Sequence, residues 1–230
     1  MKFSFVIPTY DKFGLTSDLL MDIYQKCQST SEVLVVDNGS KEWATQEGFH
    51  FWSRIQPFHL KVARLEENVG FLRAANYGLK KATGDVIALI SNDVRIHKDV
   101  IRLTSEIFEA FGDKILLGGR LLDWDTGWNC FNGKIYPYVE GWALIATRSA
   151  WEEFGYFDER YAPNDMEDVD LGATAASLGY KLMQFPPYYG EVMTHIGAQT
   201  LSYGDERMAL TLKNKAKFEE KWNTKSSEGA

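Results

Sequence analysis

Carboxylate side chains that follow two apolar runs of the first half are of the type that binds metal ions. Asp37 follows the run Val33–Val36, and Asp93 follows the run Val86–Ile90. If both face one crevice of an acidic protein, a nucleoside diphosphate is repelled unless a cation bridges them. Mg²⁺ or Mn²⁺, bound by carboxylate and phosphate oxygens, is the natural choice.

The commonest phosphate-binding loops are absent from the sequence. Neither GxxxxGK[ST] nor GxGxxG after the first apolar run occurs, so a phosphate-bearing ligand would need a metal. The alternative is that Asp37-Asn38-Gly39-Ser40 and Ser91-Asn92-Asp93 are turns, because Asn, Asp and Gly favour turns for backbone reasons alone. Taken singly, each segment is better explained as a turn.

Apolar periodicity predicts strands that alternate with helices in the first half. This alternation indicates an α/β fold with a mainly parallel, doubly wound sheet, which binds ligands at the carboxyl ends of its strands. Each predicted strand is followed by polar residues, so four strand ends are expected to face one crevice. The predicted strands are Phe3–Ile7, Val33–Val36, Leu60–Leu65 and Val86–Ile90, and the predicted helices are Leu15–Cys27 and Phe71–Ala82.

The second half is less regular, with no internal repeat or low-complexity linker. We therefore expect one domain over residues 1–224, whose halves 1–95 and 96–224 share a core, and a disordered tail at 225–230. Helices are predicted at Lys98–Phe111, Asn164–Leu171 and Asp205–Trp222, and strands at Ile115–Gly118, Ala143–Thr147 and Lys181–Phe185.

Composition narrows the partners and the location. The net charge is −7 and no basic cluster stands out, so nucleic acid is disfavoured as a partner. No segment approaches the ~18 apolar residues of a membrane span, and the first residues lack a signal-peptide pattern. Cys27 and Cys130 lie far apart in the sequence, which favours reduced thiols. We expect a cytoplasmic protein.

A series of short motifs extends along nearly the whole chain. In their order and spacing they resemble family 2 glycosyltransferases of the GT-A fold. The motifs are Val6-Ile7-Pro8-Thr9-Tyr10, Val35-Val36-Asp37-Asn38-Gly39-Ser40, Asn68-Val69-Gly70-Phe71, Ala74-Ala75-Asn76-Tyr77-Gly78, Gly84-Asp85, Ser91-Asn92-Asp93, Gly155-Tyr156-Phe157-Asp158-Glu159, Glu167-Asp168-Val169-Asp170-Leu171 and Gly179-Tyr180.

The resemblance implies a nucleotide-sugar donor bound by the first half and an acceptor bound by the second half. The donor would be a UDP-, dTDP- or GDP-sugar, and the Asn-Asp motif with the late His is similar to rhamnosyltransferase-like members, which favours a deoxyhexose. By the same resemblance the donor would contact Pro8, Thr9, Tyr10, Asp37, Asn68, Gly70, Phe71, Arg73, Asn76 and Asn92.

The metal motif of the family, usually Asp-x-Asp, is replaced here by Ser91-Asn92-Asp93. The resemblance implies Asp93 as the direct carboxylate ligand of Mn²⁺ or Mg²⁺, and His195 as a second ligand, because neutral imidazole suits Mn²⁺. The alternative for His195 is a structural histidine.

The Glu-Asp pair of the family places a general base beneath the acceptor hydroxyl, which assigns this role to Asp168, with Glu167 or Asp170 as alternatives. The implied mechanism is a single displacement that inverts the anomeric carbon. In isolation Asp165, Glu167 and Asp168 are better explained as helix N-terminal charges, and the family resemblance reverses this preference. The family also often carries an Arg shortly afterwards, where this chain has Ala173-Thr174-Ala175.

The acceptor is expected to be a glycan or a glycolipid, with peripheral membrane contact through the latter. Trp128, Trp142 and Glu167 are the candidate acceptor contacts. Trp124, Trp128, Tyr136, Tyr138 and Trp142 lie in one Gly-punctuated stretch, and they either stack on sugar rings or fill the interface between the halves. Two competing functions are a non-catalytic sugar-binding module of the same fold and a sugar-phosphate nucleotidyltransferase.

Overall fold

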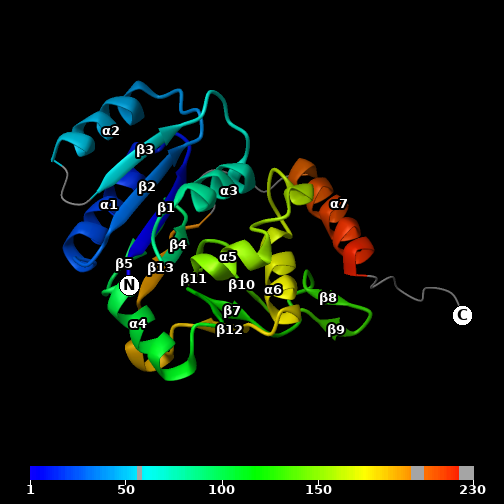
Figure 1. Cartoon of the computed structure of the whole chain (residues 1–230). Helices are drawn as coiled ribbons and strands as arrows, with labels where there is room; N and C mark the ends of the chain where they lie inside the picture. Colours follow the sequence, from blue (N-terminus) through cyan, green and yellow to red (C-terminus); the bar gives the residue numbers. More distant parts are fainter. Residues whose placement is uncertain (56–58, 198–204, 223–230) are drawn as a thin grey trace, which may run out of the picture.

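A seven-stranded sheet forms the centre of the molecule, in the order β12-β6-β11-β4-β1-β2-β3 (Figure 1). The computed structural model describes residues 1–55, 59–197 and 205–222. The expected tail at 225–230 lies outside these residues. The strands of the sheet are β1 (Phe3–Thr9), β2 (Glu32–Asp37), β3 (Leu60–Arg64), β4 (Val86–Ile90), β6 (Ile115–Gly118), β11 (Ala143–Thr147) and β12 (Lys181–Gln184).

The strand pairing is mostly parallel. β1 lies between β2 and β4 and is parallel to both, β2 is parallel to β3, and β6 is parallel to β12. β11 is antiparallel to both of its neighbours, β4 and β6. The predicted α/β fold with a mainly parallel sheet is therefore confirmed.

Helices cover both faces of the sheet because side chains of the strands alternate in direction. Phe5 and Ile7 of β1 pack in one apolar cluster with residues of α1, α2 and α4, whereas Val6 packs in another with residues of α3, α5, α6 and α7. Both clusters join residues of the two halves of the chain. The helices are α1 (Phe13–Lys26), α2 (Trp43–Ile55), α3 (Phe71–Lys81), α4 (Val100–Phe111), α5 (Arg148–Phe154), α6 (Glu167–Ser177) and α7 (Asp205–Trp222).

The predicted elements all occur, with some shifted ends. β1 continues through Pro8 and Thr9, two residues further than predicted. The helix predicted from Asn164 begins instead at Glu167 and runs to Ser177. Asp165 and Met166 have φ values of 71° and 75°, and these left-handed conformations keep the preceding segment out of the helix.

Short strand pairs outside the main sheet, which the sequence did not predict, bring distant segments together. β5 (Val94–Ile96) pairs antiparallel with β13 (Met193–His195), β7 (Leu121–Leu122) pairs with β10 (Tyr138–Val139), and β8 (Cys130–Phe131) pairs with β9 (Lys134–Ile135). Strands of two or three residues leave no periodicity to detect.

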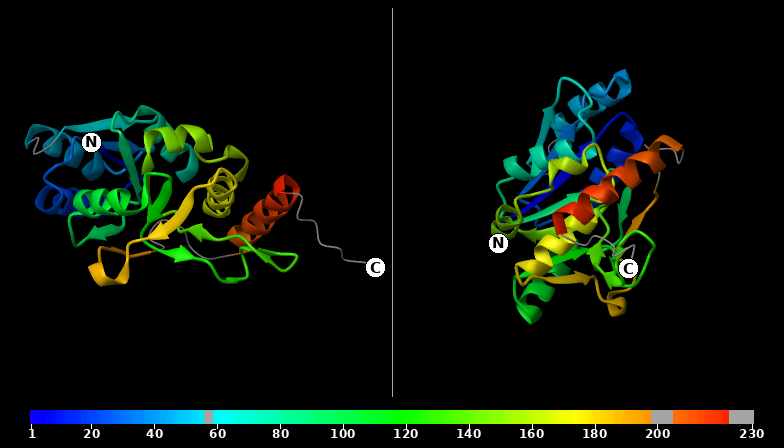
Figure 2. Two further views of the ribbon diagram at one scale, coloured as in Figure 1. Left: turned by 60° about the horizontal axis from the view of Figure 1, so that its bottom comes forward. Right: turned by 90° about the vertical axis from the view of Figure 1, so that its right-hand side faces the viewer.

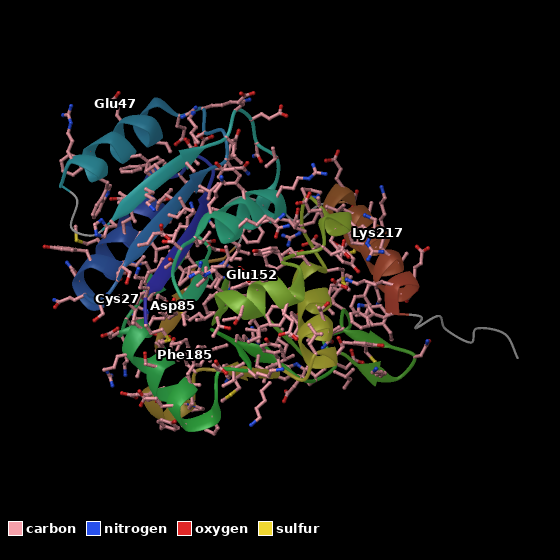
Figure 3. All side chains as sticks on the ribbon, in the orientation of Figure 1. Cys27, Glu47, Asp85, Glu152, Phe185 and Lys217 are labelled. Atoms are coloured by element: carbon pink, nitrogen blue, oxygen red, sulfur yellow. The ribbon has the colours of Figure 1, made fainter. Side chains whose placement is uncertain are left out.

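Helix α7 closes the second half of the molecule, where it lies beside the β8–β9 hairpin (Figures 1 and 2). Phe218 is fully buried, and its ring stacks on that of Phe131 at a centroid distance of 4.7 Å. Lys217, labelled in Figure 3, donates to the backbone carbonyl of Arg160. Among the described residues, no helix has both the length and the apolar run that crossing a membrane requires.

Candidate active site

A cavity of about 1340 Å³ opens at the carboxyl ends of β1 and β4 and is closed on the other side by the start of α6 and by α7. The cavity thus lies at the carboxyl ends of the strands, where the sequence predicted the ligand-binding crevice. All but two of the predicted donor, metal and acceptor contacts line this cavity, together with the predicted base. They are Pro8, Thr9, Tyr10, Asn68, Gly70, Phe71, Arg73, Asn92, Asp93, Trp128, Trp142, Glu167, Asp168 and His195.

The two exceptions, Asp37 and Asn76, lie behind the cavity wall. The Asp37 carboxylate pairs with Arg64 at 3.0 Å and accepts from the Ser40 backbone N–H at 2.9 Å. Asn76 exchanges hydrogen bonds with the backbone of Phe157, at 2.9 and 3.0 Å, and so joins α3 to the segment after α5. Both side chains are buried, and in this geometry they support the wall.

The loop before α3 is held by a pair of amides. Asn38 donates to Asn68 at 2.9 Å and accepts from the Val69 backbone N–H at 2.9 Å. Gly70 has a φ of +87°, and a Cβ there would meet Pro163 at 2.7 Å, so a side chain is excluded at this approach of two segments. Asn38 also lines the cavity, and sequence reasoning missed it although it directly follows Asp37.

Asn92 fixes the end of β4 against β1. Its amide group donates to the hydroxyls of Thr9 at 3.1 Å and Thr16 at 3.3 Å. The carboxylate of the next residue, Asp93, is thereby presented from a short, tethered turn between β4 and β5. Its side chain is 8% exposed.

Asp93 and His195 meet through the pairing of β5 with β13. Oδ1 of Asp93 lies 3.2 Å from Nε2 of His195, and the Ile196 backbone N–H donates to the Asp93 carbonyl at 2.9 Å. The His195 ring stacks on Trp142 at a centroid distance of 5.4 Å and an interplanar angle of 10°. One carboxylate and one imidazole thus converge on the cavity. No cluster of three acidic, His or Cys side chains suited to a metal occurs in the described part of the chain.

Asp168 lies in the first turn of α6 with its carboxylate oriented by two backbone donors. It accepts from the Gly141 N–H at 3.1 Å and from the Val169 N–H at 2.9 Å. Burial, and after it the nearby Glu140 carboxylate, raise the pKa of this carboxyl from 3.8 to about 6, a net rise that already includes the lowering effect of the two backbone N–H groups. A carboxylate with this pKa is ionised near neutral pH and can accept a proton there.

The two alternative bases differ from Asp168. Glu167 is buried, and its Oε2 atom has no hydrogen-bond partner in the described part of the chain. Burial first, and then the Asp168 charge, raise its pKa well above the usual range. Asp170 is held by Tyr161, Lys221 and Trp222 at 3.2, 2.7 and 2.9 Å and does not line the cavity.

The aromatic stretch of the second half divides between the cavity and the core. Trp128, Tyr138 and Trp142 line the cavity, whereas Tyr136 packs edge-on against Phe218 of α7 in the core. A contribution from α7 was not predicted.

Arg207 pairs with Asp165 at 3.0 Å, and both residues line the cavity. Nothing in the sequence of α7 marks its first turns as part of a site.

A family model covers most of the chain. The model of "Glycosyl transferase family 2" matches residues 4–168. The uncharacterized glycosyltransferase YfnE of Bacillus subtilis is 33% identical over 102 residues, 44% of this chain and 25% of YfnE. The chain therefore spans about a quarter of the length of that relative.

Two solved structures show the same fold. GalNAc-T7 with UDP, GalNAc and Mn²⁺ superposes with a TM-score of 0.76 at 16% identity, over 95% of this chain and 48% of that chain. PcManGT, a mannosyltransferase from Pyrobaculum calidifontis in complex with GDP-Man and Mn²⁺, superposes with a TM-score of 0.66 at 18% identity, over 86% of this chain and 58% of that chain. This likeness identifies the GT-A fold, and because the family model matches most of the sequence, the chain belongs to glycosyl transferase family 2.

Proposed function

We propose that this protein transfers a sugar from a nucleotide-diphosphate donor to a hydroxyl of a glycan or glycolipid acceptor, with a divalent metal and with inversion at the anomeric carbon. The observation that carries the proposal is that the Asp93–His195 pair and the raised-pKa carboxyl of Asp168 line one cavity. The Asp93–His195 pair suits a metal and a leaving diphosphate, and the Asp168 carboxyl suits an incoming hydroxyl.

Asp93 and His195 would supply two ligands to a metal that is also bound by the diphosphate of the nucleotide sugar. A carboxylate oxygen and an imidazole nitrogen 3.2 Å apart suit Mn²⁺, and Mg²⁺ less well because it prefers oxygen ligands. The remaining positions would be filled by diphosphate oxygens and water. A metal bound there would neutralise the charge that develops on the leaving diphosphate.

Asp168 would act as the general base in one displacement step. Its carboxylate takes the proton of the acceptor hydroxyl, the acceptor oxygen forms a bond to the anomeric carbon, and the bond from that carbon to the diphosphate oxygen breaks. The backbone N–H groups of Gly141 and Val169 donate to this carboxylate and hold it in place. Because attack comes from the face opposite the leaving group, the configuration inverts.

The nucleotide would lie along Pro8, Thr9 and Tyr10 and the loop around Asn68. Tyr10 and Phe71 offer rings to a base, and glycine at position 70 allows close approach. One solved structure contains GDP-Man and the other UDP, which supports UDP- and GDP-sugars as donors, and the family resemblance adds dTDP-sugars to the panel. A deoxyhexose donor is the first choice from the resemblance of the Asn-Asp motif.

Release of nucleoside diphosphate from UDP-, dTDP- and GDP-sugars, with Mn²⁺, Mg²⁺ or EDTA, tests the proposal. We expect turnover with one donor class that requires metal and is lost in Asp168→Asn, while Asp113→Asn, an exposed acid outside the cavity, retains it. Donor binding without turnover would instead support the non-catalytic module. A product with retained configuration in proton NMR couplings would contradict the single displacement.

A further inference from the structure

A second hollow, of about 740 Å³, lies beside the proposed active site and shares a wall with it. Glu140, Trp142 and His195 line both spaces. The other walls come from the segment 119–124, from Gln184 of β12 and from β13. A molecule whose reacting group lies near Asp168 could therefore extend past Trp142 into the second hollow.

The shared wall is held in one position. The Trp142 indole N–H donates to Glu140 at 2.8 Å, and the ring stacks on His195. Gly119 makes room for the same ring, because a Cβ at this position would lie 1.8 Å from the Trp142 ring. A fixed aromatic wall between two hollows can position adjoining parts of one ligand at low entropic cost.

The lining of the second hollow has the chemistry that binds sugars. Trp124 is 49% exposed, and the guanidinium group of Arg120 lies 6.0 Å from its ring centroid. Arg120 also lies 3.6 Å from the Glu140 carboxylate. An exposed indole face with a few convergent polar groups suits a sugar ring, which has an apolar face and hydroxyls at its edge.

The charge of the hollow favours a neutral sugar. Arg120 is opposed by the carboxylates of Asp123 and Glu140, so anionic groups are repelled. A phosphate or a uronic acid would also have to compete with Glu140 for Arg120.

We propose that the second hollow binds the sugar unit adjoining the one that is glycosylated, so that the acceptor is a neutral glycan of two or more units. Trp124 is the platform for that unit and Arg120 a hydrogen-bond donor to it. This inference rests on the proposed function.

The test measures transfer from the nucleotide sugar that is turned over in the donor panel. The acceptors are neutral oligosaccharides of one to four units and a matched series with a uronic acid as the second unit. For the wild type we expect kcat/KM to rise about tenfold from one to two units, the usual order for a well-packed aromatic contact. Trp124→Ala should lose this increment, and Tyr188→Ala should keep it, since Tyr188 is 75% exposed and belongs to neither lining. The uronic-acid series should lack the increment.

Thermal unfolding of Trp124→Ala and Tyr188→Ala checks that both variants are folded. Trp124→Phe, which keeps an aromatic face, should recover most of the increase in kcat/KM from one to two units. Equal kcat/KM for one and two units, an unchanged increment in Trp124→Ala, or a preference for the uronic-acid series would each overturn the inference. Metal-dependent donor hydrolysis with no transfer to any neutral oligosaccharide would also overturn it while leaving the proposed function intact. Absence of donor hydrolysis would reject both.

Discussion

Replacing Asp168 by Asn is expected to stabilise the folded protein at neutral pH and to abolish transfer. Burial raises the pKa of this carboxyl from 3.8 to about 6, so its ionised form is less favourable in the folded than in the unfolded chain. The stability that the protonated form contributes is present below about pH 4 and is lost as the pH rises through about 6. An Asn side chain does not titrate, so in Asp168→Asn this contribution to the pH dependence of stability is absent.

The magnitude follows from the pKa difference. A rise from 3.8 to about 6 corresponds to about 3 kcal/mol at 1.36 kcal/mol per pKa unit. Asp168 is only half-buried, and solvent reduces this value to about 1 to 3 kcal/mol. The Asn amide has one acceptor oxygen for two backbone donors, those of Gly141 and Val169, and one lost hydrogen bond costs about 1 kcal/mol at every pH.

The pH dependence therefore separates the two effects. Urea unfolding of the wild type, Asp168→Asn and Asp113→Asn should be measured between about pH 4 and pH 8. We expect the wild type to lose about 1 to 3 kcal/mol relative to Asp168→Asn over this range, and Asp113→Asn to follow the wild type. If the curves of the wild type and Asp168→Asn run parallel, the Asp168 carboxyl is not desolvated and the argument for its raised pKa fails.

Three further predictions concern this cavity and the hollow beside it. The kcat/KM of the wild type should rise with pH through about 6 and then level, because Asp168 must be ionised to accept a proton; a profile that falls over this range would contradict its role as base. His195→Ala should raise the Mn²⁺ concentration for half-maximal donor hydrolysis by about tenfold or more, and an unchanged titration would remove His195 from the metal site. Gly119→Ala should lower the free energy of unfolding by about 1 to 3 kcal/mol, because its Cβ would lie 1.8 Å from the Trp142 ring, whereas Gly14→Ala, with nothing within 4 Å, should be neutral or stabilising.

The sheet and its ligand-binding edge could be predicted because continuous apolar runs mark buried strands. β4, β6 and β11 have the predicted bounds. The position of a residue in a strand or helix does not fix what its side chain contacts. Asp37 and Asn76 are predicted to contact the nucleotide, and in the structure their side chains bond to Arg64 and to the Phe157 backbone.

Contacts between distant segments could not be predicted from local patterns. β5 and β13 are three residues each, and their pairing across almost a hundred residues is what brings Asp93 to His195. From the residues alone, His195 was an isolated histidine, and only the family resemblance suggested a ligand. The pairing of Arg207 with Asp165 likewise depends on how α7 docks, which its sequence does not encode.

The turn Glu140-Gly141-Trp142 is the physical link between the two chemical centres of the cavity. The Gly141 N–H orients Asp168, and the Trp142 ring packs on His195. Glu140 accepts from the Trp142 indole and also raises the pKa of Asp168. Because the turn leads directly into β11, which is bonded on both sides in the central sheet, these contacts start from a rigid strand. The Gly141 and Trp142 contacts to Asp168 and His195 are thus tied to the central sheet, and the proposed displacement needs a base and a metal site that are held in this way.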